Sequence, residues 1–364
     1  YEEGKIRAIG VSNFYPDRLV DICSFSRIKP MVNQVEVHPF YQQEEAKKWM
    51  DKYSVQIEAW APFGEGRGNM FQNPVLNEIG NALCAFFAEK GIQPYSEETG
   101  RGLVRHIFLR RGAHSGQIMV CLVCTRAKLP SAEELCTRLK AQFAEITTIL
   151  LNVNAKNTNV ILGTETHTLY GPGYIEDTLC GVPVQLGPLS FYQVNTLAAE
   201  QLYGIAAQYA QLTPDDLLLD LYCGMGTIGL SMAAHCRELI GVEIVPEAIE
   251  SAKANAARMG ADVAAKSRFF CADAGQAATR LAAEGLHPDI VMLDPPRKGC
   301  DEATLSAVVR MSPRRVVYVS CNPATAARDA AWLEQNGYHA EKVQPVDLFP
   351  RTRHCECVLS LSKV

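Results

Sequence analysis

A strand, a glycine-rich turn and a helix follow one another in the second half of the chain, and this succession constrains the fold more than any other feature. The run Asp215-Asp-Leu-Leu-Leu-Asp220 predicts an apolar strand that leads into Tyr222-Cys-Gly-Met-Gly-Thr-Ile-Gly229 and a helix reaching Ala234. Such a unit aims backbone N–H groups and the positive end of a helix dipole at the anionic part of a ligand. The glycines allow a close approach of the backbone. We therefore expect a doubly wound α/β sheet.

The glycine turn by itself fits two classes of cofactor. Gly224, Gly226 and Gly229 match the dinucleotide-binding fingerprint, and Glu243 follows at the end of the next strand, where an acid binds a ribose. A nicotinamide-dependent enzyme is one interpretation, and a methyltransferase that uses S-adenosylmethionine is the other.

Two further strands end in acids that favour the methyltransferase. Phe269-Phe-Cys-Ala-Asp273 closes a third strand with a carboxylate suited to an adenine amino group, and Asp294-Pro-Pro-Arg297 closes a fourth. A carboxylate fixed by a rigid Pro-Pro turn at the carboxyl end of a strand lies at the ligand crevice of such a sheet. Methyltransferases that act on nucleobases use this turn to present an acceptor to the edge of the base. Nicotinamide enzymes have no such use for it.

The fifth strand, Arg315-Val-Val-Tyr-Val-Ser320, delivers Cys321 at its carboxyl end, directly before a helix. The dipole of that helix favours the thiolate, so Cys321 stands where a nucleophile belongs. A cysteine nucleophile suits the methylation of a pyrimidine carbon. Uracil C5, for example, is too weak a nucleophile to attack a sulfonium methyl group unaided. Addition of a thiolate at C6 turns C5 into an enolate carbon, which supplies the missing reactivity.

The same reaction needs a base to remove the C5 proton after methyl transfer. The C-terminal run His354-Cys-Glu356 offers two candidates, and we favour Glu356 over His354. His354 with Cys355 and Cys357 also raises the question of a metal site. Alternate residues of a strand point to opposite faces, and no complementary ligand pair stands elsewhere, so we expect no metal.

Taken together, residues 81–364 resemble the RNA uracil-5-methyltransferase family. The motifs that match are Ser190-Phe-Tyr-Gln-Val-Asn195, Asp220-Leu-Tyr-Cys-Gly-Met-Gly226, Asp294-Pro-Pro-Arg297, Ser320-Cys-Asn-Pro-Ala-Thr325 and His354-Cys-Glu356. The resemblance implies that the cofactor and base sites are lined by Gln193, Tyr222, Thr227, Glu243, Asp273 and Asp294. It makes Cys321 the nucleophile and Glu356 the base, with S-adenosylmethionine as the methyl donor. The form Ser-Cys-Asn-Pro-Ala-Thr, followed by Ala-Arg-Asp, is more similar to the 23S ribosomal RNA enzymes than to the transfer RNA enzyme.

The catalytic domain is expected over residues 186–364, after a small α+β domain over 81–185. The latter has alternating strands around Gly116–Val123 and a helix around Ser131–Phe143. The best local candidates for phosphate contacts are Arg101, Arg105, Arg110, Arg111 and Lys156. Solvated strand edges are an equally good interpretation of their spacing.

Residues 1–80 contain a different set of motifs, which resemble those of the aldo-keto reductase family. The matching motifs are Gly10-Val-Ser-Asn-Phe14, Asn33-Gln-Val-Glu-Val-His-Pro39 with Gln42-Gln43, and Ala59-Trp-Ala-Pro-Phe-Gly-Glu-Gly-Arg67. The resemblance implies that Ser12, Asn13 and Gln34 hold a nicotinamide carboxamide and that the loop after Trp60 approaches a pyrophosphate. It ends near Gly80, and the catalytic tetrad of a reductase has no counterpart. A parallel barrel needs eight units to close, so about three units predict a partial barrel in a fused chain.

Composition limits the partners. No apolar run approaches the roughly 18 residues of a membrane span, so a cytoplasmic protein is expected. The thirteen cysteines are scattered, and we interpret most of them as reduced and buried. The formal charge of −5 gives no bulk attraction to a polyanion, so any RNA affinity must come from a local patch. RNA, most closely 23S ribosomal RNA, is the expected partner, with neither DNA nor membrane; protein partners are not predicted.

Two other functions stay open at this point: an NADPH-dependent reductase of the aldo-keto type, truncated and inactive, and an inert fusion that only binds S-adenosylmethionine. Ribosomal members of the family usually begin with a small β-barrel RNA-binding domain and a cysteine cluster that holds a 4Fe-4S centre. The reductase-like segment stands in that place. We therefore predict no iron–sulfur cluster and weakened RNA binding.

Overall fold

The computed structural model describes residues 5, 8–36, 43–60, 73–156, 160–349, 352 and 354–364. The chain divides into two compact units, Tyr1–Asn81 and Ala82–Val364. The border between them falls within the helix α3 (Pro74–Glu89). The expected division of the second unit at residue 185 remains a prediction, because both of its parts share one compact unit.

The first unit contains a parallel three-stranded sheet, ordered β1-β2-β3. Its strands are β1 (Gly10–Ser12), β2 (Val32–Glu36) and β3 (Gln56–Trp60), and its helices are α1 (Pro16–Phe25) and α2 (Glu44–Tyr53). The helices bury Leu19, Cys23, Ala46 and Met50 together with Val35 and Val55. This alternation of strand and helix confirms the predicted piece of a β/α barrel.

The second unit opens with α3 and a mixed four-stranded sheet ordered β4-β5-β6-β7. Its elements are β4 (Val104–Arg111), β5 (Ile118–Cys124), α4 (Ala132–Gln142), β6 (Ile146–Val153) and β7 (Glu165–Tyr170). All seven residues of β5 are buried, as expected for a strand with a neighbour on each side and both faces covered. β5 and β6 are parallel and joined through α4, whereas the outer pairs are antiparallel.

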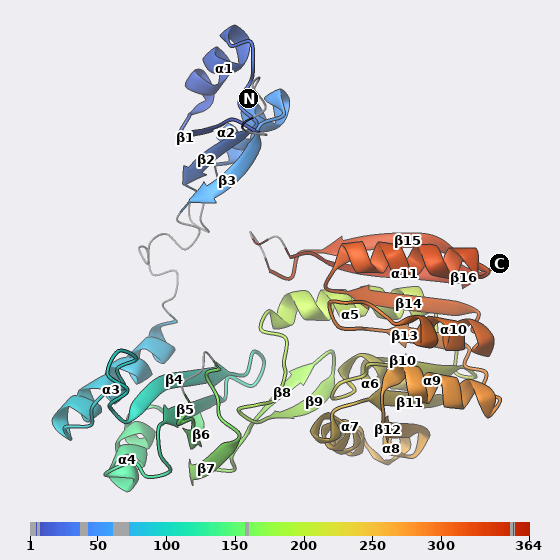
Figure 1. Ribbon diagram of the computed structural model, residues 1–364. Helices are drawn as coiled ribbons and strands as arrows, with labels where there is room; N and C mark the ends of the chain where they lie inside the picture. The colour runs from blue at the N-terminus through green and yellow to red at the C-terminus, as the bar shows by residue number, and fades with distance from the viewer. Residues whose placement is uncertain are drawn as a thin grey trace. The chain divides into compact units, whose positions relative to one another are not determined.

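A two-stranded hairpin, β8 (Ile175–Leu179) and β9 (Val182–Leu186), follows the four-stranded sheet. Its buried side chains belong to the same apolar core as Met119 of β5 and Leu218 of the next sheet. The hairpin therefore connects the small α+β region to the catalytic region through packing as well as through the chain (Figure 1).

The remainder forms a seven-stranded sheet in the order β12-β11-β10-β13-β14-β16-β15. The strands are β10 (Leu217–Leu221), β11 (Glu238–Glu243), β12 (Ser267–Cys271), β13 (Ile290–Leu293), β14 (Arg315–Ser320), β15 (Tyr338–Val346) and β16 (Glu356–Lys363). The first five strands in spatial order are parallel, and β16 runs antiparallel to both neighbours. The continuous apolar sequences of β10, β13 and β14 are typical of parallel strands that are buried on both faces.

Helices cover both faces of this sheet, which confirms the predicted doubly wound architecture (Figure 1). The helices are α5 (Thr196–Ala210), α6 (Thr227–Met232), α7 (Pro246–Met259), α8 (Ala261–Lys266), α9 (Ala274–Ala283), α10 (Glu302–Met311) and α11 (Pro323–Gln335), with a 3-10 turn η2 (Ala233–His235) after α6. One core contains buried residues of α5, α6 and α7, and the other those of α9, α10 and α11. Within the described ranges, every helix falls short of the length and apolar character that crossing a membrane requires.

Candidate active site

The order of the sheet reverses between β10 and β13, and the connections leave in opposite directions there. In an open α/β sheet this switch point forms the ligand crevice at the carboxyl ends of the strands. The glycine turn after β10 lies at this place. Gly224 has a φ of +56°, and a Cβ placed on it would meet no atom within 4 Å. The turn therefore presents bare backbone to open space, as the sequence predicts.

Glu243 closes the turn from the neighbouring strand β11. One carboxylate oxygen accepts a hydrogen bond from the Gly224 N–H at 3.1 Å. The other accepts from the N–H groups of Ile244 at 2.8 Å and Val245 at 3.0 Å. These bonds hold the carboxylate rigidly beside the glycine turn, at the position where an acid would contact a ribose.

Asp220, near the end of β10, is a polar residue of the site that the sequence analysis did not single out. It is 1% exposed, and its Oδ2 accepts from the Gly229 N–H at 3.0 Å. Its Oδ1 is buried and has no hydrogen-bond partner among the described residues. Burial raises the pKa of Asp220 to about 7, and the nearby Glu243 adds to the effect. An acid near the end of the central strand, directly before the glycine turn, was the available signal.

Asp294 of the Pro-Pro turn lies across the switch point from Asp220. Burial raises its pKa to about 8, and the charges of Asp220 and Glu356 contribute further. The structure thus places three carboxyl groups, those of Asp220, Asp294 and Glu243, around one crevice, and a positively charged ligand would favour their ionised forms.

The other predicted cofactor residues have more varied positions. Asp273 caps α9 by accepting from the Gln276 N–H at 3.1 Å. Thr227 and Gln193 both act on the hydroxyl of Tyr203, a buried residue of α5 that lies near Asp294 and was missed in the sequence. The pairing places Gln193 and Thr227 beside the crevice.

Tyr222 adopts a left-handed backbone conformation, with a φ of +66°. Its hydroxyl lies 3.3 Å from the Thr304 Oγ1 of α10. The ring packs against the core on the side of α9, α10 and α11. The phenol is therefore anchored to a helix on that face of the sheet, and its backbone forms the start of the glycine turn.

Cys321 and Glu356 come from neighbouring antiparallel strands. The last residue pair of the ladder between β14 and β16 joins Ser320 to Cys357, so Cys321 and Glu356 are the next residues along each strand. Side chains of directly opposed residues lie on the same face of a sheet. Consistent with this placement, the carboxyl groups of Glu356 and Asp294 both act on the Cys321 thiol electrostatically. The structure therefore brings together the predicted nucleophile, the predicted base and the acid of the Pro-Pro turn.

The pKa of the Cys321 thiol differs from the expectation that the helix dipole favours its thiolate. Burial raises the pKa of the Cys321 thiol, and Glu356 and Asp294 raise it further, whereas Arg297 lowers it. The expected stabilisation of the thiolate by the helix dipole does not prevail, because burial and the two nearby acids together outweigh it. Burial also raises the pKa of Glu356, which is 8% exposed, and Arg297 again opposes it. Arg297 is thus the cation shared by the nucleophile and the base.

His354, the other candidate base, lies beside this cation. Its Nδ1 is 3.4 Å from an Arg297 guanidinium nitrogen. Within the described part of the chain, no group of three His, Cys, Asp or Glu side chains has the geometry of a metal site. Cys121 and Cys124 lie in the fully buried strand β5.

The residues of the crevice fit the charges of S-adenosylmethionine. S-adenosylmethionine carries a sulfonium and an ammonium group, so it needs nearby acids and an uncrowded backbone. The unpartnered Oδ1 of Asp220, the raised pKa of Asp294 and the open space at Gly224 meet these needs. Asp220 and Asp294 would lie near the cationic part of the cofactor, Glu243 would bind its ribose, and Asp273, just after β12, would bind its adenine.

Two of the five candidate phosphate ligands are internal. The Arg105 side chain is 2% exposed; it donates to the carbonyl oxygens of Asn154 at 3.2 Å and Lys156 at 2.6 Å. Arg110 donates to the Gly187 carbonyl oxygen at 2.7 Å. These two arginines join loops of the second unit, so neither is a solvated strand edge. Arg101, Arg111 and Lys156 are exposed.

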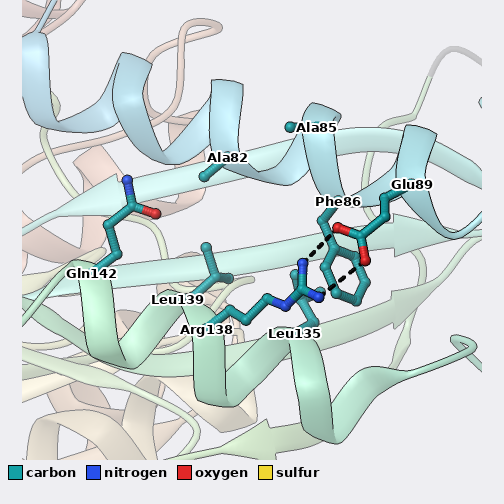
Figure 2. Close-up of a pocket in the computed structure, with 8 residues that line it drawn as sticks. All are labelled: Ala82, Ala85, Phe86, Glu89, Leu135, Arg138, Leu139 and Gln142. Carbon is teal, nitrogen blue, oxygen red and sulfur yellow. Dashed lines mark hydrogen bonds and ion pairs between the residues drawn. The ribbon is translucent and has the colours of Figure 1, made fainter.

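A pocket between α3 and α4 lies within the small α+β region. Figure 2 shows its lining, in which Arg138 makes a two-bonded ion pair with Glu89 at 2.6 and 3.0 Å. Glu134 and Lys90 extend this surface network. None of its lining residues belongs to the chemistry at the switch point.

In the first unit, the predicted reductase residues lie together at the carboxyl ends of β1 and β2. Ser12 pairs with Gln34 in the ladder, and its hydroxyl donates to the Gln34 carbonyl oxygen at 3.1 Å. The Asn13 N–H donates to the same oxygen at 2.8 Å. The rest of the resemblance came from motif segments after Glu36 and Trp60. These segments, residues 37–42 and 61–67, lie outside the described residues.

The doubly wound sheet and the acidic crevice at its switch point define an S-adenosylmethionine-dependent methyltransferase. A family model of tRNA (uracil-5-)-methyltransferases matches residues 131–364, and the chain belongs to this family of RNA methyltransferases. The first unit is similar to another family, since a model of the aldo/keto reductase family matches residues 1–166. That match extends past Gly80, where the likeness was expected to end. It takes in β5, α4 and β6, a parallel β/α unit of the second compact unit.

Individual relatives agree with the family. An uncharacterised RNA methyltransferase of Oceanobacillus iheyensis is 38% identical over 351 residues, which covers 91% of this chain and 74% of the relative. One from Halalkalibacterium halodurans is 45% identical over 292 residues and covers 80% and 63%. The crystal structure of Pyrococcus abyssi tRNA (uracil-54, C5)-methyltransferase with S-adenosyl-L-homocysteine superposes with a TM-score of 0.63 at 27% identity, covering 77% of this chain and 65% of that one. The chain thus spans about two thirds of the length of these relatives.

Proposed function

We propose that this protein methylates C5 of a uridine in RNA, with Cys321 as the covalent nucleophile and Glu356 as the base. The observation that carries the proposal is the convergence of Cys321, Glu356 and Asp294 at one end of the sheet, beside the acidic crevice. A nucleophile, a base and a fixed acceptor for the base edge are the three groups that this reaction requires.

The first step forms a bond between the Cys321 sulfur and C6 of the uracil. The thiol proton passes to water, since the side chain is only partly buried. The electron pair of the C5–C6 double bond moves toward the C4 carbonyl oxygen, and C5 becomes an enolate carbon. We assign to the Asp294 carboxyl group, which acts on the Cys321 thiol, the role of orienting the uracil edge during this addition. Arg297 lowers the pKa of the thiol and so raises the fraction of thiolate.

The cofactor, when bound, supplies an electrophilic methyl group for C5. C5 then carries both a methyl group and its original hydrogen. Glu356 accepts that C5 proton, the electron pair restores the C5–C6 double bond, and the bond between C6 and the Cys321 sulfur breaks. Burial raises the pKa of Glu356, which makes its carboxylate a stronger base than an exposed glutamate.

We further propose ribosomal RNA of the 23S type as the substrate. The proposal rests on the sequence Ser320-Cys-Asn-Pro-Ala-Thr325 with Ala327-Arg-Asp329 after it, which is more similar to the ribosomal enzymes of the family. The exposed Arg101, Arg111 and Lys156 would contact its phosphates. A cytoplasmic location follows from this substrate. An assay on 23S and transfer RNA transcripts in parallel distinguishes the two substrate classes.

Release of tritium from RNA that contains 5-tritiated uridine, with S-adenosylmethionine present, tests the reaction itself. The wild-type chain should release label, and the Cys321→Ala variant should release none. Label release by Cys321→Ala at the wild-type rate would contradict the covalent route. Cofactor binding without any release by the wild type would instead support the inert fusion, and oxidation of NADPH with aldehydes would support a reductase.

A further inference from the structure

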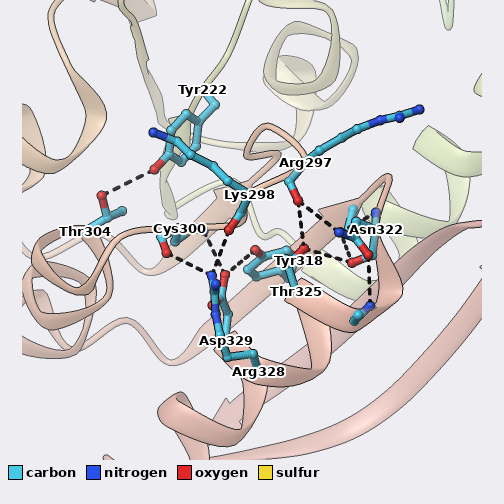
Figure 3. Close-up of polar contacts among 12 residues, drawn as sticks. Tyr222, Arg297, Lys298, Cys300, Thr304, Tyr318, Asn322, Thr325, Arg328 and Asp329 are labelled. Carbon is cyan, nitrogen blue, oxygen red and sulfur yellow. Dashed lines mark hydrogen bonds and ion pairs between the residues drawn. The ribbon is translucent and has the colours of Figure 1, made fainter.

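The loop from Arg297 to Cys300, which continues from the Pro-Pro turn, is held by polar side chains of α11. The Asn322 side-chain amide donates to the Arg297 carbonyl oxygen at 3.0 Å, and the Thr325 hydroxyl lies 3.3 Å from the same oxygen. The Arg328 guanidinium donates to the carbonyl oxygens of Lys298 at 3.0 Å and Cys300 at 3.2 Å. Figure 3 shows these hydrogen bonds between the start of α11 and the backbone of the loop.

Asp329 anchors the grip from within the core. It is 1% exposed, and its Oδ2 accepts from the Cys300 N–H at 2.8 Å and the Tyr318 hydroxyl at 2.6 Å. Its Oδ1 accepts from the Arg328 Nε at 2.8 Å. A buried carboxylate with three donors is held in one place, because loss of any partner leaves part of its charge unsatisfied. Asp329 therefore fixes both the loop and the arginine that grips it (Figure 3).

Gly299 shows how closely the loop is seated. It has a φ of +78°, and a Cβ built there would lie 2.5 Å from an Arg328 guanidinium nitrogen and 2.6 Å from the Asp329 Oδ2. Only a residue without a side chain allows the loop to approach the two charged groups in this way.

The hydrogen bonds join the Arg297–Cys300 loop to α11, and each of these segments starts beside the proposed reaction site. α11 begins at Pro323, two residues after Cys321. The residues on either side of Cys321 bond to each other: the Asn322 N–H donates to the Ser320 Oγ, and the Ser320 hydroxyl donates to the Asn322 carbonyl oxygen, each at 3.0 Å. The loop begins with Arg297, the cation that acts on both Cys321 and Glu356. The ionisable groups that act on the Cys321 thiol are Glu356, Asp294 and Arg297, and Cys357 lies within range of it.

We propose that Arg328 and Asp329 are positioning residues that lock the Arg297–Cys300 loop onto α11 and thereby hold the Arg297 guanidinium beside Cys321. Neither residue is required to touch the RNA or the cofactor. The role of Cys321 as nucleophile rests on the proposed function, but the positioning does not. Arg297 is the cation that lowers the pKa of the Cys321 thiol, and Arg328 hydrogen bonds to the loop that begins with it.

The test measures the pH dependence of alkylation of Cys321 by iodoacetamide in the full chain, without RNA or cofactor. Mass spectrometry follows the peptide that contains Cys321, and the exposed Cys271 serves as an internal reference. The variants are Arg328→Met, Arg297→Met and the double variant. Arg280→Met is the matched control, because this helix arginine is 56% exposed against 57% for Arg328 and pairs with Glu284, away from the loop.

Arg328→Met should raise the apparent pKa of the Cys321 thiol by about 0.5 to 1, which slows alkylation at pH 7 roughly 3- to 10-fold. Arg297→Met should do the same, and the double variant should show no further change, because both substitutions remove one effect. Arg280→Met and the Cys271 profile should not change. Asp329→Asn, if it folds, should resemble Arg328→Met.

An unchanged thiol pKa in Arg328→Met, with an unchanged circular dichroism spectrum, would overturn the proposal. Additive shifts in the double variant would also overturn it, because Arg328 would then act by a path other than Arg297. The alkylation assay remains informative if tritium release is absent in the wild type, so failure of the positioning role and failure of the proposed methylation can be told apart.

Discussion

Ser320 of β14 pairs with Cys357 of β16 as the last residue pair of an antiparallel ladder. One residue further along each strand stand Cys321 and Glu356. Cys321 and Glu356, 35 positions apart in the sequence, are therefore neighbours because β16 enters the sheet beside β14 rather than at its edge. This arrangement places the base of the proposed reaction next to its nucleophile, and it leads to the first prediction.

Glu356→Gln should trap the enzyme on its RNA. Addition and methyl transfer need Cys321, whereas elimination needs removal of the C5 proton, so the amide should allow the adduct to form and persist. We expect tritium release to fall by about 10²- to 10⁴-fold. A band of protein bound to RNA that survives denaturing electrophoresis should appear.

The double variant with Cys321→Ala is the control for this band, which should then vanish. Wild-type turnover by Glu356→Gln would remove Glu356 from the role of base and point to His354.

Cofactor affinity should increase with pH. Burial and neighbouring acids raise the pKa of Asp294 to about 8 in the free protein. A cationic ligand binds its ionised form, so below that pH binding must first release a proton. The dissociation constant of S-adenosylmethionine should therefore fall by up to about tenfold per pH unit between pH 6 and 8, and level off above.

Calorimetry in two buffers of different ionisation enthalpy measures the released proton directly. Asp294→Asn should bind more weakly at pH 8 and release fewer protons. The same proton release in Asp294→Asn as in the wild type would assign the titration to another group, with Asp220 as the first alternative.

Asp220→Asn should stabilise the cofactor-free protein at alkaline pH. The folded-state pKa of Asp220 is raised to about 7, whereas an unfolded chain has about 3.9. The wild type therefore loses stability as the pH rises from about 4 to 7, and the loss is complete above the folded pKa. The amide avoids this loss while its oxygen still accepts from the Gly229 N–H.

We expect Asp220→Asn to gain about 1–3 kcal/mol in the free energy of unfolding at pH 8, and much less at pH 4.5. Denaturant unfolding at both pH values measures the difference. An equal gain at both would show that ionisation of Asp220 is not its cause.

Arg111→Ala and Arg105→Ala should have different consequences although both arginines lie on β4. Arg111 is exposed and available to a phosphate, so its loss should weaken RNA binding and reduce the salt slope of log K by about one. The Arg105 side chain is enclosed and hydrogen bonds to Asn154, Lys156 and Glu97. Its guanidinium carbon lies 4.8 Å from the centre of the Tyr95 ring. Its loss should lower the melting temperature instead.

Filter binding across a salt series and a thermal melt of each variant separate the two effects. Equal salt slopes for the wild type and Arg111→Ala would exclude β4 from the RNA surface.

Much of the site could be predicted because its residues follow strands. Gly224, Glu243, Asp273, Asp294 and Cys321 each stand just after, or at the end of, an apolar run, and parallel strands carry their carboxyl ends to one edge. Asp329 had no such signal, because it lies within a helix and its function depends on a loop 29 residues earlier. The same holds for Tyr203, whose partner Gln193 precedes it but whose neighbour Asp294 is far along the chain.

The sequence by itself determined which elements form, in which order, and which chemical groups stand at their ends, because periodicity, turn residues and motif spacing are local properties. Only the tertiary structure decided the state of those groups. Burial and the nearby acids raise the pKa of the Cys321 thiol against the effect of its own helix. Asp220 has one oxygen without a hydrogen-bond partner among the described residues, and Arg105 is enclosed rather than exposed. Burial and electrostatic interaction depend on distances between residues that are remote in the chain, and those distances exist only once the sheet and its helices have packed.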